Sequence, residues 1–326
     1  MAQILNSVSY SYDDVNLIAR NPSVVSSRTE IPPDLGRIIV SPMSSIVGLS
    51  FTKEALKLGL RVCLHRFCPI SVQYDIFQEA RRELAHYESY RLICAIGLHD
   101  EGRAKALADA GCRFFIIDCA NGYLVKDITR MVHFLGENGA QTIIVGNVHD
   151  SHIFRFYEQI AENDPPFTLF IRVGIGGGTV CKTGAVTGVT RGQITELLDC
   201  AQQAKNLRII ADGGVRDSGC AAKAFAAGAH FVMMGGYFAR ALEAETNING
   251  SHVYFGGASQ YQQEKYGGMR RHSEGTRIFI KKDDLVSLAS LVQDLWGGLS
   301  SAISYSGYST LPEFIGNGVF EVRHSK

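Results

Sequence analysis

The sequence predicts an α/β fold: a closed (β/α)8 TIM barrel with a long flap after its last strand, a C-terminal helix and a tail. The first observation is a series of eight short apolar runs, at 37–43, 61–67, 91–97, 114–120, 142–148, 168–176, 208–214 and 231–236. The runs show no polar alternation, which is typical of strands buried on both faces of a parallel sheet. The second is the count of eight, which favours a barrel. An open doubly wound sheet is the alternative, but its dinucleotide fingerprint is missing.

The segments around these runs complete the predicted fold. Residues up to about 36 form an N-terminal arm, and helix patterns between the runs occupy 51–59, 101–111, 191–206 and 219–229. Residues from about 247 to 282 are polar, rich in Gly and Tyr and without clear periodicity, which predicts the long flap. A last helix is expected at 283–299, before a tail rich in Ser and Tyr. Because α/β barrels of roughly 250 residues count as one unit, we expect a single domain over 1–326.

Composition excludes several classes of protein. Lys+Arg and Asp+Glu are both 32, so the formal net charge is zero, which argues against a nucleic-acid binder but not against a site for a small phosphorylated molecule. No apolar run approaches the ~20 residues of a membrane span, and the N-terminus lacks the pattern of a signal peptide. The eight cysteines are scattered and form no C-x-x-C pair, which disfavours zinc and favours reduced thiols in the cytoplasm.

A glycine-rich loop follows the sixth run, at 173–188, with the sequence VGIGGGTVCKTGAVTG. It is not a P-loop, because Cys181 stands where that motif needs glycine, and it does not open a helix as G-x-G-x-x-G does. We expect a loop of about ten residues here. Cys181 is a candidate nucleophile at the catalytic end of a strand; the pattern alone leaves an ordinary core cysteine equally open.

Two glycine pairs end the seventh and eighth runs: Gly213 with Gly214, and Gly235 with Gly236. Barrels commonly hold a phosphate at these two strand ends. Glycines there let main-chain N–H groups point at an anion. The alternative for each pair is a tight turn between strand and helix. Two pairs at these positions favour phosphate binding.

Longer motifs make a family resemblance specific. The stretch GIGGGTVCKTGAVTGV resembles the catalytic loop of the IMP dehydrogenase/GMP reductase family, and IIADGGVRDSGCAAKAFAAGAHFVMMGG resembles its phosphate-binding segment. IIDCANGY and IIVGNV are similar to the cofactor side of the GMP reductase branch. Segments near both ends match in order, so the resemblance covers nearly the whole chain.

Two features favour the reductase branch over the dehydrogenase. Dehydrogenases usually carry a regulatory module after the second strand, whereas only one helix length separates Arg66 from Arg91. They also carry an Arg-Tyr pair in the flap, and the sequence from 247 to 282 has none. The alternatives are an IMP dehydrogenase without its regulatory module, a catalytically silent purine-nucleotide-binding barrel, and an unrelated flavin-dependent barrel.

The resemblance implies NADPH-dependent reductive deamination of GMP to IMP and ammonia. In that reaction Cys181 attacks C2 of the guanine and forms a covalent thioimidate. Thr183 and Glu274 match the relay that protonates the leaving amine. Glu274 lies on the flap, so the resemblance implies that it reaches Thr183 only when the flap closes.

The resemblance also implies the binding residues and a homotetramer. Positions matching the purine nucleotide site are Thr179, Asp212, Gly213, Gly214, Gly235, Gly236, Gly256, Gly257, Ala258, Arg271, His272, Ser273 and Gly275. Positions matching the NADPH site are Ser27, Arg28, Arg66, Asp118, Cys119, Ala120, Ile175, Gly176, Ser301 and Ser304, the last two reaching the cofactor of a neighbouring subunit. A potassium site would use the main-chain carbonyls of Gly176, Gly178, Cys181 and Gly184.

Five positions depart from the family pattern. Proline and serine of the catalytic loop are replaced by Gly177 and Thr179, an aspartate by Ser44, a lysine by Arg66 and a methionine by Gly257. Glycine for proline loosens the loop before the nucleophile, and arginine keeps the charge of lysine but does not give up a proton. Because they alter ligand contacts, these changes favour a nucleotide other than plain GMP, such as a deoxy or base-modified one. The predicted substrate is therefore GMP or a related purine nucleotide.

Overall fold

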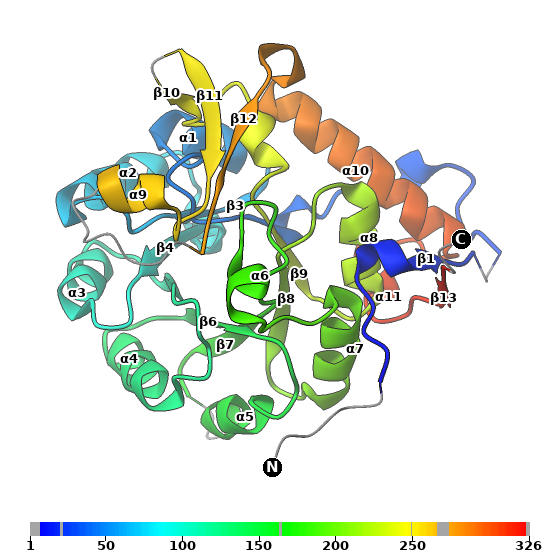
Figure 1. Ribbon diagram of the computed structural model, residues 1–326, viewed down its shortest axis with the longest axis horizontal. Helices are drawn as coiled ribbons and strands as arrows, with labels where there is room; N and C mark the ends of the chain where they lie inside the picture. The colour runs from blue at the N-terminus through cyan, green and yellow to red at the C-terminus, as the bar shows by residue number, and fades with distance from the viewer. Residues whose placement is uncertain (1–6, 20–21, 163–164, 249, 266–273, 324–326) are drawn as a thin grey trace.

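The computed structural model describes residues 7–19, 22–162, 165–248, 250–265 and 274–323. Within them, eight parallel strands close into a barrel, with β9 paired to β2 (Figure 1). The strands are β2 (Ile38–Val40), β3 (Arg61–Leu64), β4 (Leu92–Ile96), β5 (Phe114–Ile117), β6 (Thr142–Val148), β7 (Thr168–Val173), β8 (Arg208–Asp212) and β9 (Phe231–Met234). Each lies within one of the eight apolar runs, so the predicted (β/α)8 barrel is confirmed.

The strands are mostly apolar because both of their faces are buried. Along β2, Ile39 belongs to the cluster inside the barrel, while Ile38 and Val40 belong to the cluster between barrel and helices. Side chains on a strand alternate between faces, so a strand covered on both sides needs apolar residues at every position. This burial accounts for the absence of polar alternation in the sequence.

Helices surround the barrel (Figure 1). They are α1 (Leu49–Lys57), α2 (Ile70–Arg81), α3 (Glu101–Asp109), α4 (Val125–Glu137), α5 (Phe154–Glu162), α7 (Gln193–Gln203) and α8 (Ser218–Ala226). In α4 the buried residues are Ile128, Met131, Val132 and Leu135, the spacing of a single helical stripe. Short 3₁₀ helices occur at Tyr12–Asp14, Arg28–Glu30, Leu35–Arg37, His86–Arg91, Phe238–Arg240 and Lys282–Asp284.

The flap after β9 contains more regular structure than its sequence indicates. It holds β10 (Asn247–Ile248), β11 (Ser251–Phe255), α9 (Gln260–Lys265) and β12 (Arg277–Ile280). The three strands form an antiparallel sheet in the order β10–β11–β12, drawn in yellow and orange in Figure 1. The sheet brings the two ends of the flap side by side, with His252 opposite Ile280.

Both ends of the described chain pack together on one side of the barrel (Figure 1). β1 (Val15–Leu17) pairs antiparallel with β13 (Phe320–Val322). The last long helix, α10 (Leu288–Tyr305), begins later than predicted, because the side chain of Ser287 caps it by accepting a hydrogen bond from the N–H of Ser290 (3.2 Å). It also runs further than predicted, to Tyr305. A short helix, α11 (Leu311–Phe314), follows in the tail.

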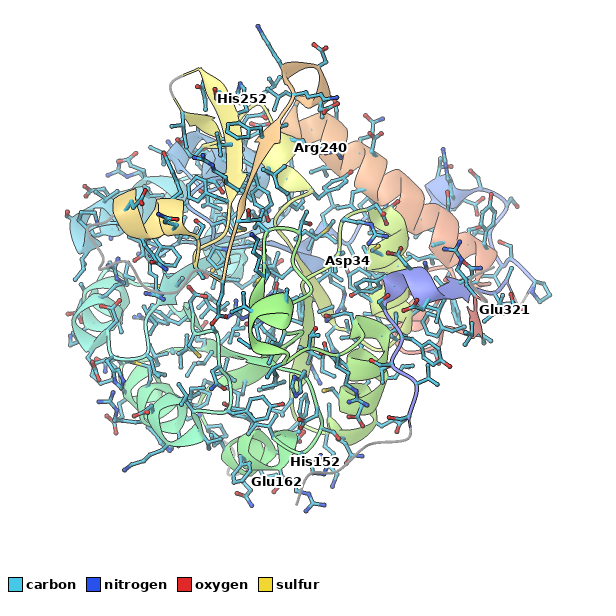
Figure 2. All side chains as sticks on the ribbon, in the orientation of Figure 1. Asp34, His152, Glu162, Arg240, His252 and Glu321 are labelled. Atoms are coloured by element: carbon cyan, nitrogen blue, oxygen red, sulfur yellow. The ribbon has the colours of Figure 1, made fainter. Side chains whose placement is uncertain are left out.

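Many charged side chains lie at the surface, whereas a few, such as Arg172 and Glu196, are buried. Figure 2 shows His152, Glu162 and Glu321 at the periphery. Across the described segments, none of the helices has the length and apolar character that crossing a bilayer requires.

Candidate active site

A cavity of about 370 Å³ opens at the carboxyl ends of the barrel strands and extends under the flap. It is the place where barrels of this architecture carry their active sites. The predicted site residues that line it are Arg66, Asp118, Cys119, Ala120, Gly178, Thr179, Cys181, Thr183, Asp212, Gly213, Gly214, Gly235, Gly236, Gly256, Gly257, Ala258, Glu274 and Gly275. The fold therefore gathers all three predicted catalytic positions, ten of the thirteen nucleotide positions and four of the ten cofactor positions around one cavity.

The loop that carries Cys181 needs glycine where it leaves β7. Gly174 has φ +135°, and a Cβ there would lie 2.0 Å from the main-chain oxygen of Asp212. Gly176 also has a positive φ, +84°. Both values are outside the range that side chains tolerate well. The glycines thus let the loop turn back over β8 and present Cys181 to the cavity.

A short helix follows the cysteine, where the sequence predicted only loop. This helix, α6, spans Thr183–Thr187 and ends at Gly188, whose φ is +73°. The prediction was wrong because five residues are too few to show helical periodicity. A glycine in the left-handed conformation is a common helix end.

The three predicted catalytic residues form one hydrogen-bonded chain. The Cys181 thiol donates to Oγ1 of Thr183 (3.2 Å), and this hydroxyl donates to Oε2 of Glu274 (2.8 Å). Main-chain contacts hold the flap residue in place: the Lys182 N–H donates to the carbonyl of Glu274 (2.6 Å), and Cys181 forms a β-bridge with Gly275. A proton can therefore move between the sulfur and the carboxylate through a single hydroxyl.

Two hydroxyl groups accompany the glycine pair after β9. A Cβ at Gly235 would lie 2.9 Å from the Tyr254 hydroxyl oxygen and from Sδ of Met43, and one at Gly236 would lie 3.4 Å from Oγ1 of Thr179. The main chain is thus exposed to the cavity between Thr179 and Tyr254. Such a cradle of main-chain groups and hydroxyls is suited to a phosphate.

Charged side chains form a network along the floor of the cavity. Arg172 is only 4% exposed and lies between Asp118 (3.4 Å) and Asp212 (3.5 Å). Arg66 also pairs with Asp118 (3.2 Å), and the Asn147 amide donates to Asp212 (2.8 Å). Burial raises the pKa of Asp212, while Arg172 and Asn147 favour its charged form. The network fixes a carboxylate that can accept hydrogen bonds from sugar hydroxyls.

Sequence reasoning missed several cavity residues, among them Arg172, Asn147, Tyr254, Met43 and Phe67. One of them carried a signal, because Arg172 is a lone charge within the apolar run TLFIRV. A charge at such a position must find partners inside the protein. Tyr254 and Phe67 resemble ordinary flap and strand residues, so the sequence alone gave no reason to select them.

Other predicted positions do not line the cavity. Arg28 donates to Ser301 (3.0 Å) and Ser304 bonds to Ser23 (3.1 Å), so these positions form a cluster of their own beside α10, near Ser27. Ile175, Gly176 and Gly184 also lie outside the lining; the carbonyl of Ile175 accepts a hydrogen bond from Thr190 (3.0 Å). Arg271, His272 and Ser273 lie outside the described residues.

The predicted potassium ligands show no feature that favours a cation. The carbonyl of Gly178 accepts from the N–H of Cys181 (2.9 Å), and that of Gly184 accepts from Gly188 (3.0 Å). These carbonyls already serve the loop and α6. In the described part of the chain, no cluster of three or more His, Cys, Asp or Glu residues is arranged to hold a metal. Potassium binding stays a prediction.

The departures from the family pattern have local partners. Ser44 is buried and donates to Oε1 of Gln262 in α9 (2.6 Å). A Cβ at Gly177 would lie 3.4 Å from the carbonyl carbon of Gly213, so this glycine packs closely on the loop after β8. A Cβ at Gly257 would lie 2.9 Å from the ring of Phe67. The substitutions therefore fit their surroundings in this chain.

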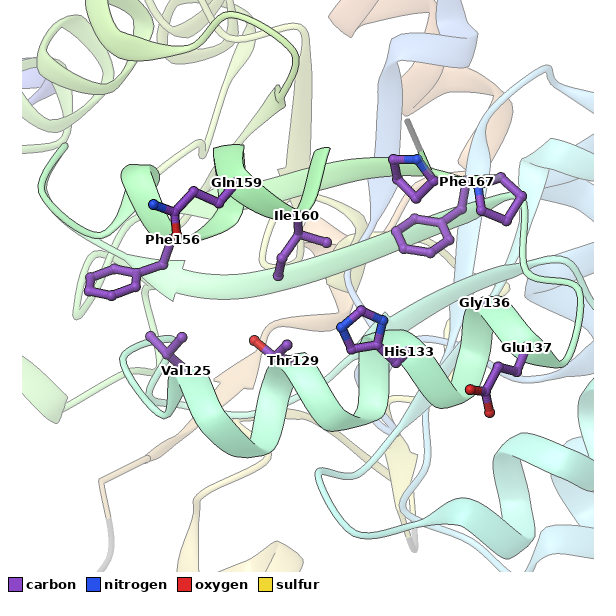
Figure 3. Close-up of a pocket in the computed structure, with 11 residues that line it drawn as sticks. Val125, Thr129, His133, Gly136, Glu137, Phe156, Gln159, Ile160 and Phe167 are labelled. Carbon is purple, nitrogen blue, oxygen red and sulfur yellow. The ribbon is translucent and has the colours of Figure 1, made fainter. Parts of the chain in front are cut away.

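A second cavity, of about 550 Å³, lies on the outside of the barrel between α4 and α5. Figure 3 shows Thr129 and His133 of α4 facing Ile160 of α5, with Phe156 and Phe167 along the same groove. None of the predicted site residues, Cys181 included, lines this cavity.

The fold and the site together define a (β/α)8-barrel protein with a thiol-centred cavity and a glycine cradle at the carboxyl ends of its strands. Comparison with protein families places the chain more narrowly. The IMP dehydrogenase / GMP reductase domain matches residues 9–325, and the chain belongs to this family.

Individual relatives agree with this placement. The chain is 32% identical to the GMP reductase of Exiguobacterium sp. (strain ATCC BAA-1283 / AT1b), over 93% of the chain and 92% of the relative. It is 29% identical to GMP reductase 2 of Homo sapiens, over 96% and 94%. It is also 34% identical to the inosine-5'-monophosphate dehydrogenase of Halobacterium salinarum, over 71% of the chain but only 48% of that protein, so it matches about half of this relative's length.

Proposed function

We propose that this chain is an oxidoreductase that uses NADPH to deaminate GMP, or a closely related purine nucleotide, to IMP and ammonia. The observation that carries the proposal is the hydrogen-bonded chain from the Cys181 thiol through Thr183 to Glu274. It supplies a nucleophile and a proton relay at one point of a nucleotide-sized cavity. The similarity to GMP reductases over more than nine-tenths of their length supports the same reaction.

The cavity offers a separate partner for each part of a nucleotide. The phosphate would bind at the glycine cradle, where Thr179 and Tyr254 add hydroxyl groups. Asp212 would accept hydrogen bonds from the ribose hydroxyls. The base would then extend toward Cys181, beneath the turn at 256–258.

The relay accounts for the first half of the reaction. As the sulfur of Cys181 bonds to C2 of the base, its proton passes through Thr183 to Glu274, which makes the thiolate the attacking group. The same proton then returns through Thr183 to the amino group at C2, so that the C2–N bond breaks and ammonia leaves. The result is a covalent thioimidate on Cys181, and the relay returns to its starting charge.

The second half requires a hydride donor next to the thioimidate. The side of the cavity lined by Asp118, Cys119 and Ala120 fits a flat cofactor ring, because two of these side chains are small and Asp118 is held by Arg66. Bound NADPH would supply a hydride to C2, after which the C–S bond breaks and frees Cys181. Cys119 is not a second nucleophile, since burial raises the pKa of its thiol, which donates to the carbonyl of Gly146 (3.2 Å).

The proposal includes assembly into a homotetramer. Ser301 and Ser304 do not line the cavity of their own chain. This position is consistent with contact to the cofactor of a neighbouring subunit. Light scattering on the purified protein tests it: a monomer at micromolar concentration would contradict this part of the proposal. Location in the cytoplasm stays a prediction.

The second candidate is an IMP dehydrogenase, favoured by the 34% identity to the Halobacterium protein. The experiment that separates the candidates is a nucleotide panel read by absorbance of the nicotinamide and by product mass. Oxidation of NADPH with GMP, yielding IMP, supports the proposal. Reduction of NAD⁺ with IMP and no reaction with GMP would establish the dehydrogenase. Binding of GMP without either reaction would indicate a catalytically silent barrel, and a yellow protein would indicate a bound flavin.

A further inference from the structure

We propose that Phe67 is a positioning residue for the proton relay. Its ring supports the turn at 256–259, and this turn places Glu274 against Thr183. The inference rests on the proposed function, because it concerns the geometry of the relay. It assigns a role to a side chain that neither touches the relay nor belongs to the flap.

The ring of Phe67 is fixed from the barrel side. Phe67 follows β3, and the guanidinium carbon of Arg66 lies 4.8 Å from the centre of its ring. Arg66 is itself held by Asp118 (3.2 Å). The His65 ring lies nearly parallel to Phe67, with centroids 6.5 Å apart. The ring thus has defined neighbours in the segment that follows β3 and, through Asp118, a link to the segment that follows β5.

The other side of the ring meets the main chain of the flap. A Cβ at Gly257 would lie 2.9 Å from Cζ and 3.0 Å from Cε2 of Phe67, closer than a real Cβ approaches a ring. The absence of a side chain at Gly257 therefore lets the turn rest directly on Phe67. A larger residue at either position would change the height of the turn above the cavity.

Main-chain contacts lead from this turn to the relay. Ser259 forms a β-bridge with Gly275, and a Cβ at Gly275 would lie 2.8 Å from the N of Ser259. Gly256 donates to the carbonyl of Thr276 (3.3 Å). Gly275 follows Glu274 directly and also bridges to Cys181. No long flexible side chain separates Phe67 from the main chain that carries Glu274.

The relay is sensitive to the height of the turn. The Thr183–Glu274 hydrogen bond measures 2.8 Å, and a shift of about 1 Å takes such a pair outside hydrogen-bonding range. Displacements of this size cost about 10²-fold in rate when they affect reacting groups. Removal of the ring should therefore impair deamination in particular.

A double-mutant cycle tests the contact, with Phe67→Ala, Gly257→Ala, the double variant and Gly102→Ala as control. Gly102 is a helical glycine with open space around its Cβ position. Deamination is measured as single-turnover ammonia release from GMP, and hydride transfer as NADPH formation from IMP and NADP⁺. We expect each single variant to lose about 10- to 100-fold in deamination and much less in hydride transfer. In the Phe67→Ala background, Gly257→Ala should add no further loss.

Equal losses in the two half-reactions, additive effects in the cycle, or unchanged deamination would overturn the inference. Amide hydrogen exchange tests the role of Phe67 independently of the proposed function, because the measurement needs no turnover. Phe67→Ala should speed exchange at the Thr276 N–H, which donates to Val180 (2.9 Å), and at the Lys182 N–H, which donates to Glu274. If these amides exchange as in the wild type, Phe67 does not support the turn, whichever reaction the protein catalyses.

Discussion

The thiol of Cys181 differs from the other cysteines in what surrounds it. Cys63, Cys94, Cys200 and Cys220 are buried, and burial raises the pKa of each thiol. Thiols of this kind are poor nucleophiles. Cys181 is partly exposed to the cavity and has a hydroxyl and a carboxylate in line with its sulfur. The reactivity that we propose for Cys181 therefore rests on its position and partners rather than on residue type.

The hydrogen-bonded chain from Cys181 through Thr183 to Glu274 leads to a prediction about two single substitutions. Thr183→Val removes the hydroxyl and keeps the shape of the side chain, and Glu274→Gln removes the proton acceptor. We expect either change to lower ammonia release from GMP by about 10²-fold or more, while hydride transfer falls much less. Thr187→Val is the matched control, because Thr187 lies in the same helix with its hydroxyl bonded to the main chain (2.7 Å). Equal loss of ammonia release and of hydride transfer would show that Thr183 and Glu274 do not relay the proton for deamination.

The burial of Glu196 leads to a second prediction, which concerns how the free energy of unfolding depends on pH. It is fully buried, neither carboxyl oxygen has a hydrogen-bond partner among the described residues, and burial raises its pKa to about 9. Between the ordinary pKa of 4.5 and about 9, the folded state holds a proton that the unfolded state has lost. Stability therefore falls as pH rises through this window, by about 1.4 kcal/mol per pH unit at most.

Denaturation of Glu196→Gln by urea at several pH values measures this effect. Glutamine carries no ionisable proton, so the decline attributed to Glu196 should disappear in the variant. Glu137→Gln, on the exposed face of α4, serves as the control and should follow the wild type. A wild-type slope retained in Glu196→Gln would show that Glu196 is ionised in the folded protein.

At the scale of elements, the N-terminal arm and α7 meet through main-chain contact. The N–H of Ile194 donates to the carbonyl of Tyr10 (3.0 Å), and a Cβ at Gly192 would lie 2.3 Å from the carbonyl carbon of Tyr10. We predict that Gly192→Ala destabilises the fold by about 1–3 kcal/mol, as overpacking does. Gly297→Ala, where a Cβ meets nothing, is the control for thermal or chemical unfolding. Equal stability of both variants would show that the arm does not pack as described.

The elements also show which features a sequence reveals. The barrel strands could be predicted because burial on two faces demands an uninterrupted apolar run. The flap strands could not, since Asn247–Ile248 and Ser251–Phe255 are short, lie mostly on a half-exposed sheet and mix polar with apolar residues. Helix α6 was missed for the same reason of length. Short elements depend on contacts that only the folded chain supplies.

At the scale of the molecule, the cavity joins segments that lie far apart in the chain. A local motif pointed to Cys181 as a candidate nucleophile. Its link to Glu274 was implied only by the family resemblance, and the hydrogen bonds that make this link are seen only in the folded chain. Arg172 and Tyr254 meet partners that lie far away in the sequence, so local pattern could not assign them. A motif predicts chemistry at one point, and the closed barrel determines which other side chains meet it.

The central claim is that Cys181 forms a covalent bond to the substrate during turnover. Intact-mass and peptide mass spectrometry of enzyme quenched in acid during reaction with GMP and NADPH tests it most directly. We expect a mass increase of one purine nucleotide, less ammonia, on the peptide that contains Cys181, and none in Cys181→Ala. Steady formation of IMP with the Cys181 peptide unmodified at every quench time would contradict it.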